Sequence, residues 1–141
     1  MNTIARLFLT AALAVPLAPA VAAPMQPGMW ELSMTTDIEG KPTTAPVGRG
    51  CITQQDIDDD TKTLPRPDGA CKLSNVQRKE DRATYDLACT KESLLMRGRA
   101  EVAFAPERYD GKVSLLVTDK NKVGLQIAMT LSAKRVGECT R

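Results

Sequence analysis

Apolar side chains recur at every second position along much of this chain, and no other feature constrains its fold as strongly. Successive side chains of a β-strand point to opposite faces, so this period predicts strands with one apolar face. The alternation is clearest in residues 29–36, 95–104, 112–118 and 125–134. Strands with one apolar and one polar face are typical of antiparallel sheets rather than buried parallel sheets. We therefore predict an all-β protein, mainly an antiparallel meander.

The apolar faces of these strands need a cover, because the only helix that the sequence predicts is short and polar. Leaving them in water would cost about 25 cal/mol per Å² of apolar surface. The sheet must therefore curl on itself or fold into two facing layers. We expect Gly98, inside one of the predicted strands, to be a bend point. The predicted architecture is a curved sheet, half-barrel or small barrel with one short helix.

Turn chemistry separates the predicted strands. Asp110–Gly111 and Asp119–Lys122 lie between the later alternating runs, and the polar segment 78–82 lies between two earlier ones. Dipeptides such as Asp-Gly are common in hairpin turns. Turns at this spacing favour consecutive hairpins.

The predicted helix begins near Thr53, because Asp56 three residues later completes an arrangement typical of a helix N-cap. The proline-containing segment 64–69 is expected to be a loop. The acidic run also resembles the start of a calcium loop. An EF-hand loop that began at Asp56 would need Gly and Glu where this chain has Thr61 and Pro67, so a solvated acidic helix is the preferred interpretation.

The N-terminus has the layout of a secretory signal peptide. A basic start and an apolar stretch over 7–15 precede the small residues of 18–23. Cleavage after Ala22 fits best, which makes 1–22 the signal peptide and 23–141 a single β-rich domain. A membrane anchor is the weaker interpretation, since a spanning helix needs roughly 20 apolar residues and prolines interrupt this stretch. We expect a periplasmic or secreted protein with no membrane span in the mature chain.

Four cysteines follow the signal peptide: Cys51, Cys71, Cys89 and Cys139. An even number in an exported chain indicates two disulfides, although four cysteines allow three pairings. A hairpin turn centred on Glu80 would place Cys71 opposite Cys89 on the apolar face. We therefore predict a Cys71–Cys89 disulfide, which leaves Cys51 and Cys139 to join the early chain to the C-terminus. A metal site is disfavoured by the cysteine spacing and the absence of histidine, and paired cysteines leave no reactive thiol.

The sequence favours a non-catalytic protein. It contains no histidine, the commonest general base and metal ligand. It has neither a glycine-rich phosphate loop nor a Gly-x-Ser-x-Gly elbow. An enzyme would need carboxylates such as Asp86, Glu101 or Asp110 to converge in a cleft, which nothing in their spacing requires. The formal net charge of +2 also argues against nucleic-acid binding, and we predict no cofactor and no metal.

Binding inside the curved sheet is the one activity that the residues suggest. Aromatic residues are only 4% of the chain, so methionines would line any space that aliphatic side chains leave. The candidate residues for binding an apolar small molecule or lipid are Trp30, Met34, Met96 and Met129. The alternative is that these residues form a dry core, with Trp30 as an anchor, and that the domain is an interaction or structural module that meets an envelope protein. Arg97 and Arg99 point outward and could receive an anionic group, although a solvated strand face is the simpler interpretation. The oligomeric state is not predicted.

The chain also resembles the bacterial domain-of-unknown-function family 3617. The resemblance begins with the Pro-Gly-hydrophobic-Trp-Glu opening of Met25–Leu32 and covers nearly the whole mature chain. It continues through Cys51–Thr53, Cys71, Cys89, Gly98–Glu101, Tyr109–Val113 and Met129–Cys139. Ala133–Lys134 and Glu138 depart from the Gly-Arg and Gly-Asp-Cys endings common in that family. The resemblance implies a small exported β-protein of Gram-negative-type bacteria with no established activity.

Overall fold

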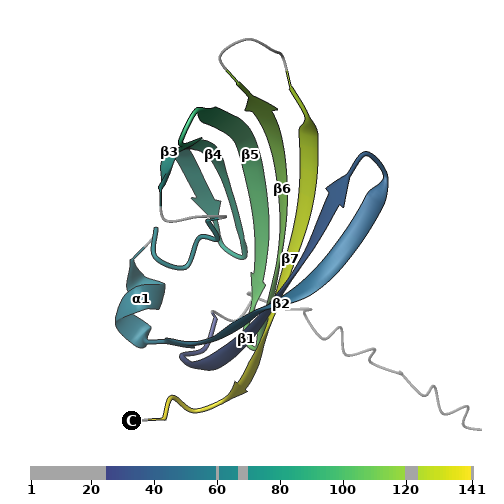
Figure 1. Cartoon of the computed structure of the whole chain (residues 1–141). Coiled ribbons are helices and arrows are strands. Elements are labelled where there is room, and N and C mark those ends of the chain that lie inside the picture. The colour runs from purple at the N-terminus through teal and green to yellow at the C-terminus, as the bar shows by residue number, and fades with distance from the viewer. Residues whose placement is uncertain (1–24, 60, 67–69, 120–123, 141) are drawn as a thin grey trace, which may run out of the picture.

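The computed structural model describes residues 25–59, 61–66, 70–119 and 124–140. These residues form one seven-stranded sheet and one short helix (Figure 1). The strands are β1 (Gly28–Ile38), β2 (Lys41–Ile52), β3 (Cys71–Lys79), β4 (Arg82–Lys91), β5 (Leu94–Ala105), β6 (Arg108–Thr118) and β7 (Gln126–Gly137). The helix α1 spans Gln54–Asp58 and lies in the link between β2 and β3.

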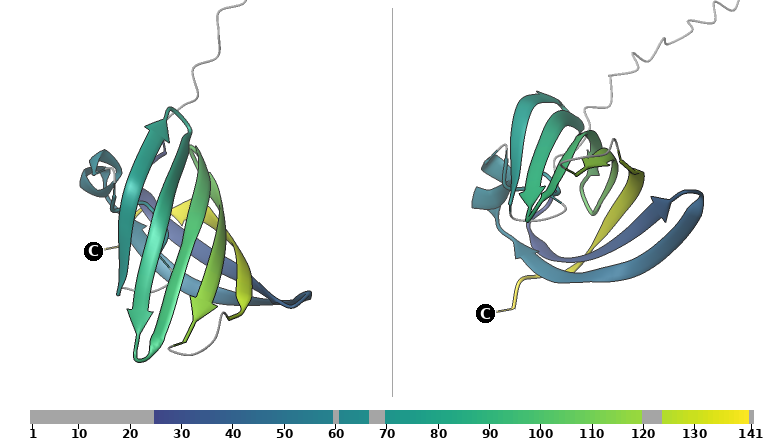
Figure 2. Two further views of the ribbon diagram at one scale, coloured as in Figure 1. Left: turned by 90° about the horizontal axis from the view of Figure 1, so that it is seen from above. Right: turned by 45° about the horizontal axis from the view of Figure 1, so that its top comes forward.

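The strand order in the sheet is β2-β1-β7-β6-β5-β4-β3, and every neighbouring pair is antiparallel. Strands β3 to β7 form consecutive hairpins, and β7 then pairs with β1, which brings the first and the last strand side by side. The sheet curls strongly without closing, so β2 and β3 remain as its edges (Figure 2). The prediction of an all-β, mainly meandering curved sheet with one short helix is therefore confirmed, in its open form.

The apolar residues of alternate positions meet on the inner face of this curl. The buried hydrophobic side chains of the strands are Trp30, Cys71, Ala83, Tyr85, Leu87, Cys89, Ala100, Val102, Phe104, Tyr109, Val113, Leu115, Met129, Leu131 and Ala133. The curl brings the backbone of β6 very close to Gly98, since a Cβ there would lie 1.8 Å from the carbonyl oxygen of Ser114. The glycine expected at a bend therefore permits a close approach between neighbouring strands.

The predicted turn at Asp110–Gly111 is wrong, because both residues lie inside β6. The chain reverses instead at Pro106 and Glu107, between β5 and β6. Proline presets the backbone dihedral that a turn needs, whereas Gly111 is buried on the inner face opposite Val102. Most of the predicted turn at 119–122 lies outside the described residues.

The β3–β4 hairpin has the predicted pairing for a reason that the sequence did not reveal. Its turn consists of Glu80 and Asp81, which alone would shift the register by one residue from the predicted one. A bulge between Ser74 and Gln77, where Asn75 has a φ of 51°, restores that register. Cys71 consequently lies directly opposite Cys89.

Strand β2 is not predicted by the sequence, because its residues do not alternate and include two prolines. Every residue of Lys41–Cys51 is exposed. Proline has no backbone N–H and fits a ladder only with its nitrogen toward the free side of an edge strand. Pro42 and Pro46 therefore remove two donors from the free edge of β2, and a bulge opposite Leu32–Ser33 distorts it further.

Helix α1 begins as predicted, with a reciprocal capping box. Thr53 Oγ1 accepts a hydrogen bond from the Asp56 backbone N–H at 3.2 Å, and Asp56 Oδ2 accepts one from the Thr53 N–H at 3.0 Å. The hydrogen bonds from Thr53 hold the pKa of the Asp56 carboxyl below its usual value. No helix in the described part of the chain is long and apolar enough to cross a bilayer.

Candidate functional site

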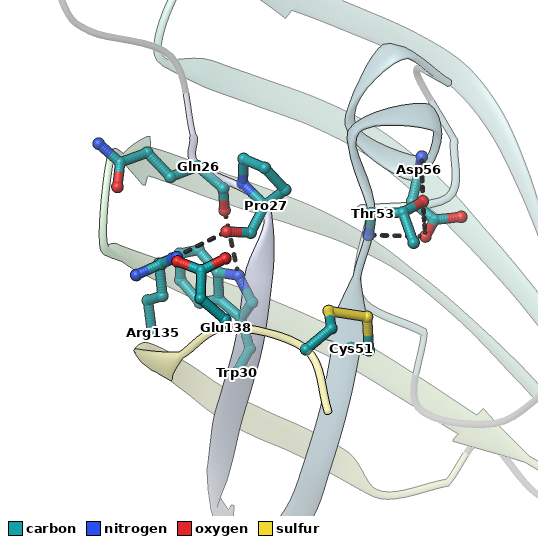
Figure 3. Close-up of a disulfide and its surroundings, with 9 residues drawn as sticks. Gln26, Pro27, Trp30, Cys51, Thr53, Asp56, Arg135 and Glu138 are labelled. Atoms are coloured by element: carbon teal, nitrogen blue, oxygen red, sulfur yellow. Dashed lines mark hydrogen bonds and ion pairs between the residues drawn. A yellow bond between two sulfur atoms is a disulfide. The ribbon is translucent and has the colours of Figure 1, made fainter. Parts of the chain in front are cut away.

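The segment that precedes β1 is tied to the end of β7 by hydrogen bonds (Figure 3). Arg135 Nε donates to the Pro27 carbonyl oxygen at 2.8 Å, and the same guanidinium pairs with Glu138. The Trp30 indole N–H donates to the Gln26 carbonyl oxygen at 3.3 Å. The Arg135–Pro27 hydrogen bond holds the Pro-Gly-Met-Trp opening against the end of β7, and the Trp30–Gln26 hydrogen bond fixes the opening internally.

Gly28 completes this junction because a larger residue has no room there. Its φ is 150°, and a Cβ would lie 2.4 Å from the Gly137 carbonyl oxygen. The next inward side chain, Trp30, is 0% exposed and packs on Tyr109 with a ring-centroid separation of 5.8 Å. Trp30 therefore offers no open ring face, and its position fits the core-anchor interpretation rather than ligand stacking.

The four cysteines form the two predicted disulfides. Cys71–Cys89 joins the neighbouring strands β3 and β4 within the core. Cys51–Cys139 joins the end of edge strand β2 to the tail after β7, over a sequence separation of 88 residues (Figure 3). No free cysteine occurs among the described residues. Two disulfides fit a protein that resides outside the reducing cytoplasm.

The three candidate methionines share the inner face and belong to the same hydrophobic core as Trp30, with Met129 among its buried members and Met34 and Met96 packed against it. Met34 on β1 lies opposite Leu131 of β7. Met129 lies on β7 as well, two residues before Leu131. Met96 lies two strands further along the sheet, on β5. Met34 and Met96 are half-buried and Met129 is buried.

The interior next to Tyr85 is filled by the chain itself. Leu64, from the link between α1 and β3, is only 3% exposed. The Tyr85 hydroxyl donates to the Pro65 carbonyl oxygen at 2.6 Å, which anchors this link in the curl. Burial raises the pKa of the Tyr85 hydroxyl, and it raises that of Tyr109 to about 12. The neutral phenols thus belong to the packed core.

The outer face of the sheet carries two grooves. The first, of about 490 Å³, crosses β2, β1, β7 and β6. Its lining residues are Glu31, Leu32, Ser33, Pro46, Arg108, Ser132, Ala133, Lys134 and Val136. The second, of about 370 Å³, crosses β4 to β7. Its lining residues are Thr84, Arg99, Ala100, Glu101, Lys112, Val113, Ser114, Ala128, Met129 and Thr130.

Arg97 and Arg99, the two residues of this outer face that the sequence suggested for binding an anionic group, do not line the first groove. Both are exposed, and Arg99, which forms a weak ion pair with Asp86 at 4.0 Å, lines the second groove. No sequence signal pointed to the groove residues Ser33, Ser132 and Lys134, because a solvated strand face also carries polar residues at alternate positions. Only the strand order, which places β1 beside β7, brings these three together.

The three carboxylates considered for catalysis all lie on this face, and each has a cationic partner. Asp86 pairs with Arg99, Glu101 with Arg82 at 3.1 Å, and Asp110 with Arg108 at 2.8 Å. Among the described residues, no three side chains of histidine, cysteine, aspartate or glutamate gather as a metal site would require.

Together, these features define a small, disulfide-stapled all-β domain with an open curved sheet. The chain belongs to the family described as "Protein of unknown function (DUF3617)", whose sequence model matches residues 25–139. Comparison with curated proteins and with solved structures gives no match.

Proposed function

We propose that this chain is an exported, non-catalytic binding domain of the cell envelope that recognises an envelope protein with the outer face of its sheet. The observation that carries the proposal is the contrast between the two faces. The inner face is occupied by the chain's own Leu64 and by large aromatic side chains. The outer face carries both grooves and the ion pairs of Asp86, Glu101 and Asp110.

Export is supported by the disulfides and by the composition of residues 1–22, which lie outside the described part of the chain. An oxidising compartment is needed for cysteines to persist as disulfides. N-terminal sequencing of the mature protein from a producing bacterium tests this step. A mature chain that begins at Ala23 is expected, and an intact Met1 in the exported fraction would contradict the cleavage.

The ion pairs of the outer face support a binding role rather than catalysis. Asp86, Glu101 and Asp110 each sit beside a cation on an open sheet surface, where water is not excluded. A general acid or base normally needs a cleft that shifts its pKa toward the working pH. Alternating charges on a sheet surface suit recognition of a complementary surface.

Site-specific photo-crosslinking in the producing cells tests the outer face. A photoreactive residue at Ser114 or Thr130, both exposed on this face, is expected to capture one and the same envelope protein. The matched control is Gln55 on α1, which is equally exposed but lies away from the outer face. Equal capture at Gln55, or no discrete product at Ser114 and Thr130, would contradict the proposal.

A second candidate function is binding of an apolar small molecule or lipid against the inner face. It is favoured by one observation, the half-buried state of Met34, Met96 and Ile127 at the end of the curl where Ile38 is 41% exposed. Native mass spectrometry of the protein isolated from its own compartment distinguishes the two candidates. A bound molecule that is lost in the Met34→Gln variant supports this second function. A spectrum that shows only the unliganded protein favours recognition of an envelope protein by the outer face.

A further inference from the structure

The first groove contains a lysine without a partner. Lys134 on β7 lies directly opposite Arg108 on one side and Glu31 on the other. Glu31 already pairs with Arg49 at 3.0 Å, and Arg108 donates two hydrogen bonds to Asp110, at 2.8 and 2.9 Å. The Lys134 ammonium group makes no hydrogen bond or ion pair within the described part of the chain. Two cations directly opposite each other repel, so an anion bound by Lys134 would stabilise this row of the sheet.

The row next to it supplies hydroxyl groups and a partly apolar wall. Ser33 Oγ and Ser132 Oγ lie 2.8 Å apart. In such a pair one hydroxyl donates to the other, and the accepting hydroxyl keeps its own proton to donate elsewhere. Pro46 and Val136, which is 45% exposed, add apolar surface to the same groove. Glu31 is the sole carboxylate among the lining residues.

We propose that this groove binds a small organic anion. Its carboxylate or phosphate group would lie between Lys134 and the paired serines, where a charge-assisted hydrogen bond from Nζ and one from a hydroxyl are available. Its apolar part would lie on Pro46 and Val136. This inference does not depend on the envelope partner, because it concerns a small molecule free in solution.

Amide chemical-shift titration of the oxidised mature chain at low salt tests the proposal. The probes are octyl phosphate below its micellar concentration, inorganic phosphate, and the neutral detergent octyl glucoside. Octyl phosphate is expected to shift the amides of Ser33, Ser132 and Lys134 saturably and to bind more tightly than inorganic phosphate. Equal affinity for octyl glucoside would overturn the anionic part of the proposal, and equal affinity for inorganic phosphate would overturn the organic part.

Three variants test which residues are responsible. Lys134→Gln is expected to weaken octyl phosphate binding about fivefold or more, because it removes the unpaired cation. Glu31→Gln is expected to strengthen binding, because it removes the carboxylate that repels the ligand. Lys112→Gln, on the same face but outside this groove, is the control and is expected to leave the affinity unchanged. Unchanged affinity in Lys134→Gln, or an equal loss in Lys112→Gln, would overturn the assignment, provided that circular dichroism shows both variants folded.

Discussion

Replacing Gly98 by alanine should destabilise the sheet far more than the same replacement at Gly111. Both glycines lie on inner-face positions of neighbouring strands, β5 and β6. A Cβ at Gly98 would lie 1.8 Å from the Ser114 carbonyl oxygen and 2.8 Å from Leu115 Cδ2. At Gly111 the nearest atom would be Val102 Cγ2 at 3.5 Å, an ordinary van der Waals contact. The first substitution forces backbone to move, and the second does not.

The two replacements share their effect on the unfolded chain, so their difference isolates the steric overlap. Alanine reduces the conformational entropy of the unfolded chain, which stabilises the folded protein by about 0.4–1 kcal/mol at either site. Overpacking inside a well-packed sheet costs about 1–3 kcal/mol. Gly111→Ala should therefore be neutral or slightly stabilising, and Gly98→Ala should be less stable than Gly111→Ala by about 1–3 kcal/mol. In a domain of this size the difference corresponds to about 4–12 °C in Tm.

Urea unfolding of both oxidised variants, followed by circular dichroism, measures this difference. Non-reducing electrophoresis should first show that both disulfides have formed in each variant, since a missing disulfide would mask the effect. If Gly98→Ala were as stable as Gly111→Ala, then the close approach of β6 to Gly98 would be refuted as a determinant of the curl.

Three further predictions concern the disulfides and the core. Removing the Cys51–Cys139 disulfide with alanines should lower the free energy of unfolding by about 4–5 kcal/mol, because it closes a long loop; a loss below about 1 kcal/mol in urea titrations would contradict this. Burial raises the pKa of Tyr109 from 10.0 to about 12. The contribution of its neutral phenol to the free energy of unfolding is therefore intact below pH 10. It is lost as the pH rises from 10 to 12, by up to about 2–3 kcal/mol. Tyr109→Phe should flatten that decline, and identical alkaline slopes for the two proteins would count against the assignment. Trp30 is the single tryptophan and is fully buried, so its fluorescence should be blue-shifted and resist iodide quenching until the protein unfolds; strong quenching of the native protein would contradict its burial.

Much of the fold follows from the sequence because period-two alternation directly reports a sheet with one buried face. The helix start was equally readable, since Thr53 and Asp56 satisfy each other's backbone within three residues. Strand β2 was not, because an exposed edge strand has no buried side chains to impose a period on its sequence. The Asp110–Gly111 signal failed because the chain reverses earlier, at Pro106 and Glu107, and Gly111 takes an inner-face position within β6.

The candidate site was harder to predict than the fold. The cysteine pairs could be deduced because a hairpin is a local structure, and pairing two cysteines leaves the other two. The first groove depends instead on β1 lying beside β7, a contact between residues about a hundred positions apart, such as Ser33 and Ser132. No local pattern encodes such a contact, because each strand alone shows only a polar outer face.

The prolines of strand β2 also help to explain how a sheet with open edges avoids self-association at high protein concentration. Fibrils and swapped oligomers grow when one molecule offers an uninterrupted row of amide and carbonyl groups to the next. Pro42 and Pro46 interrupt that row on one side of the sheet, and the bulge at Asn75 deforms the opposite side. The domain can therefore leave its barrel incomplete without becoming a template for its own polymerisation.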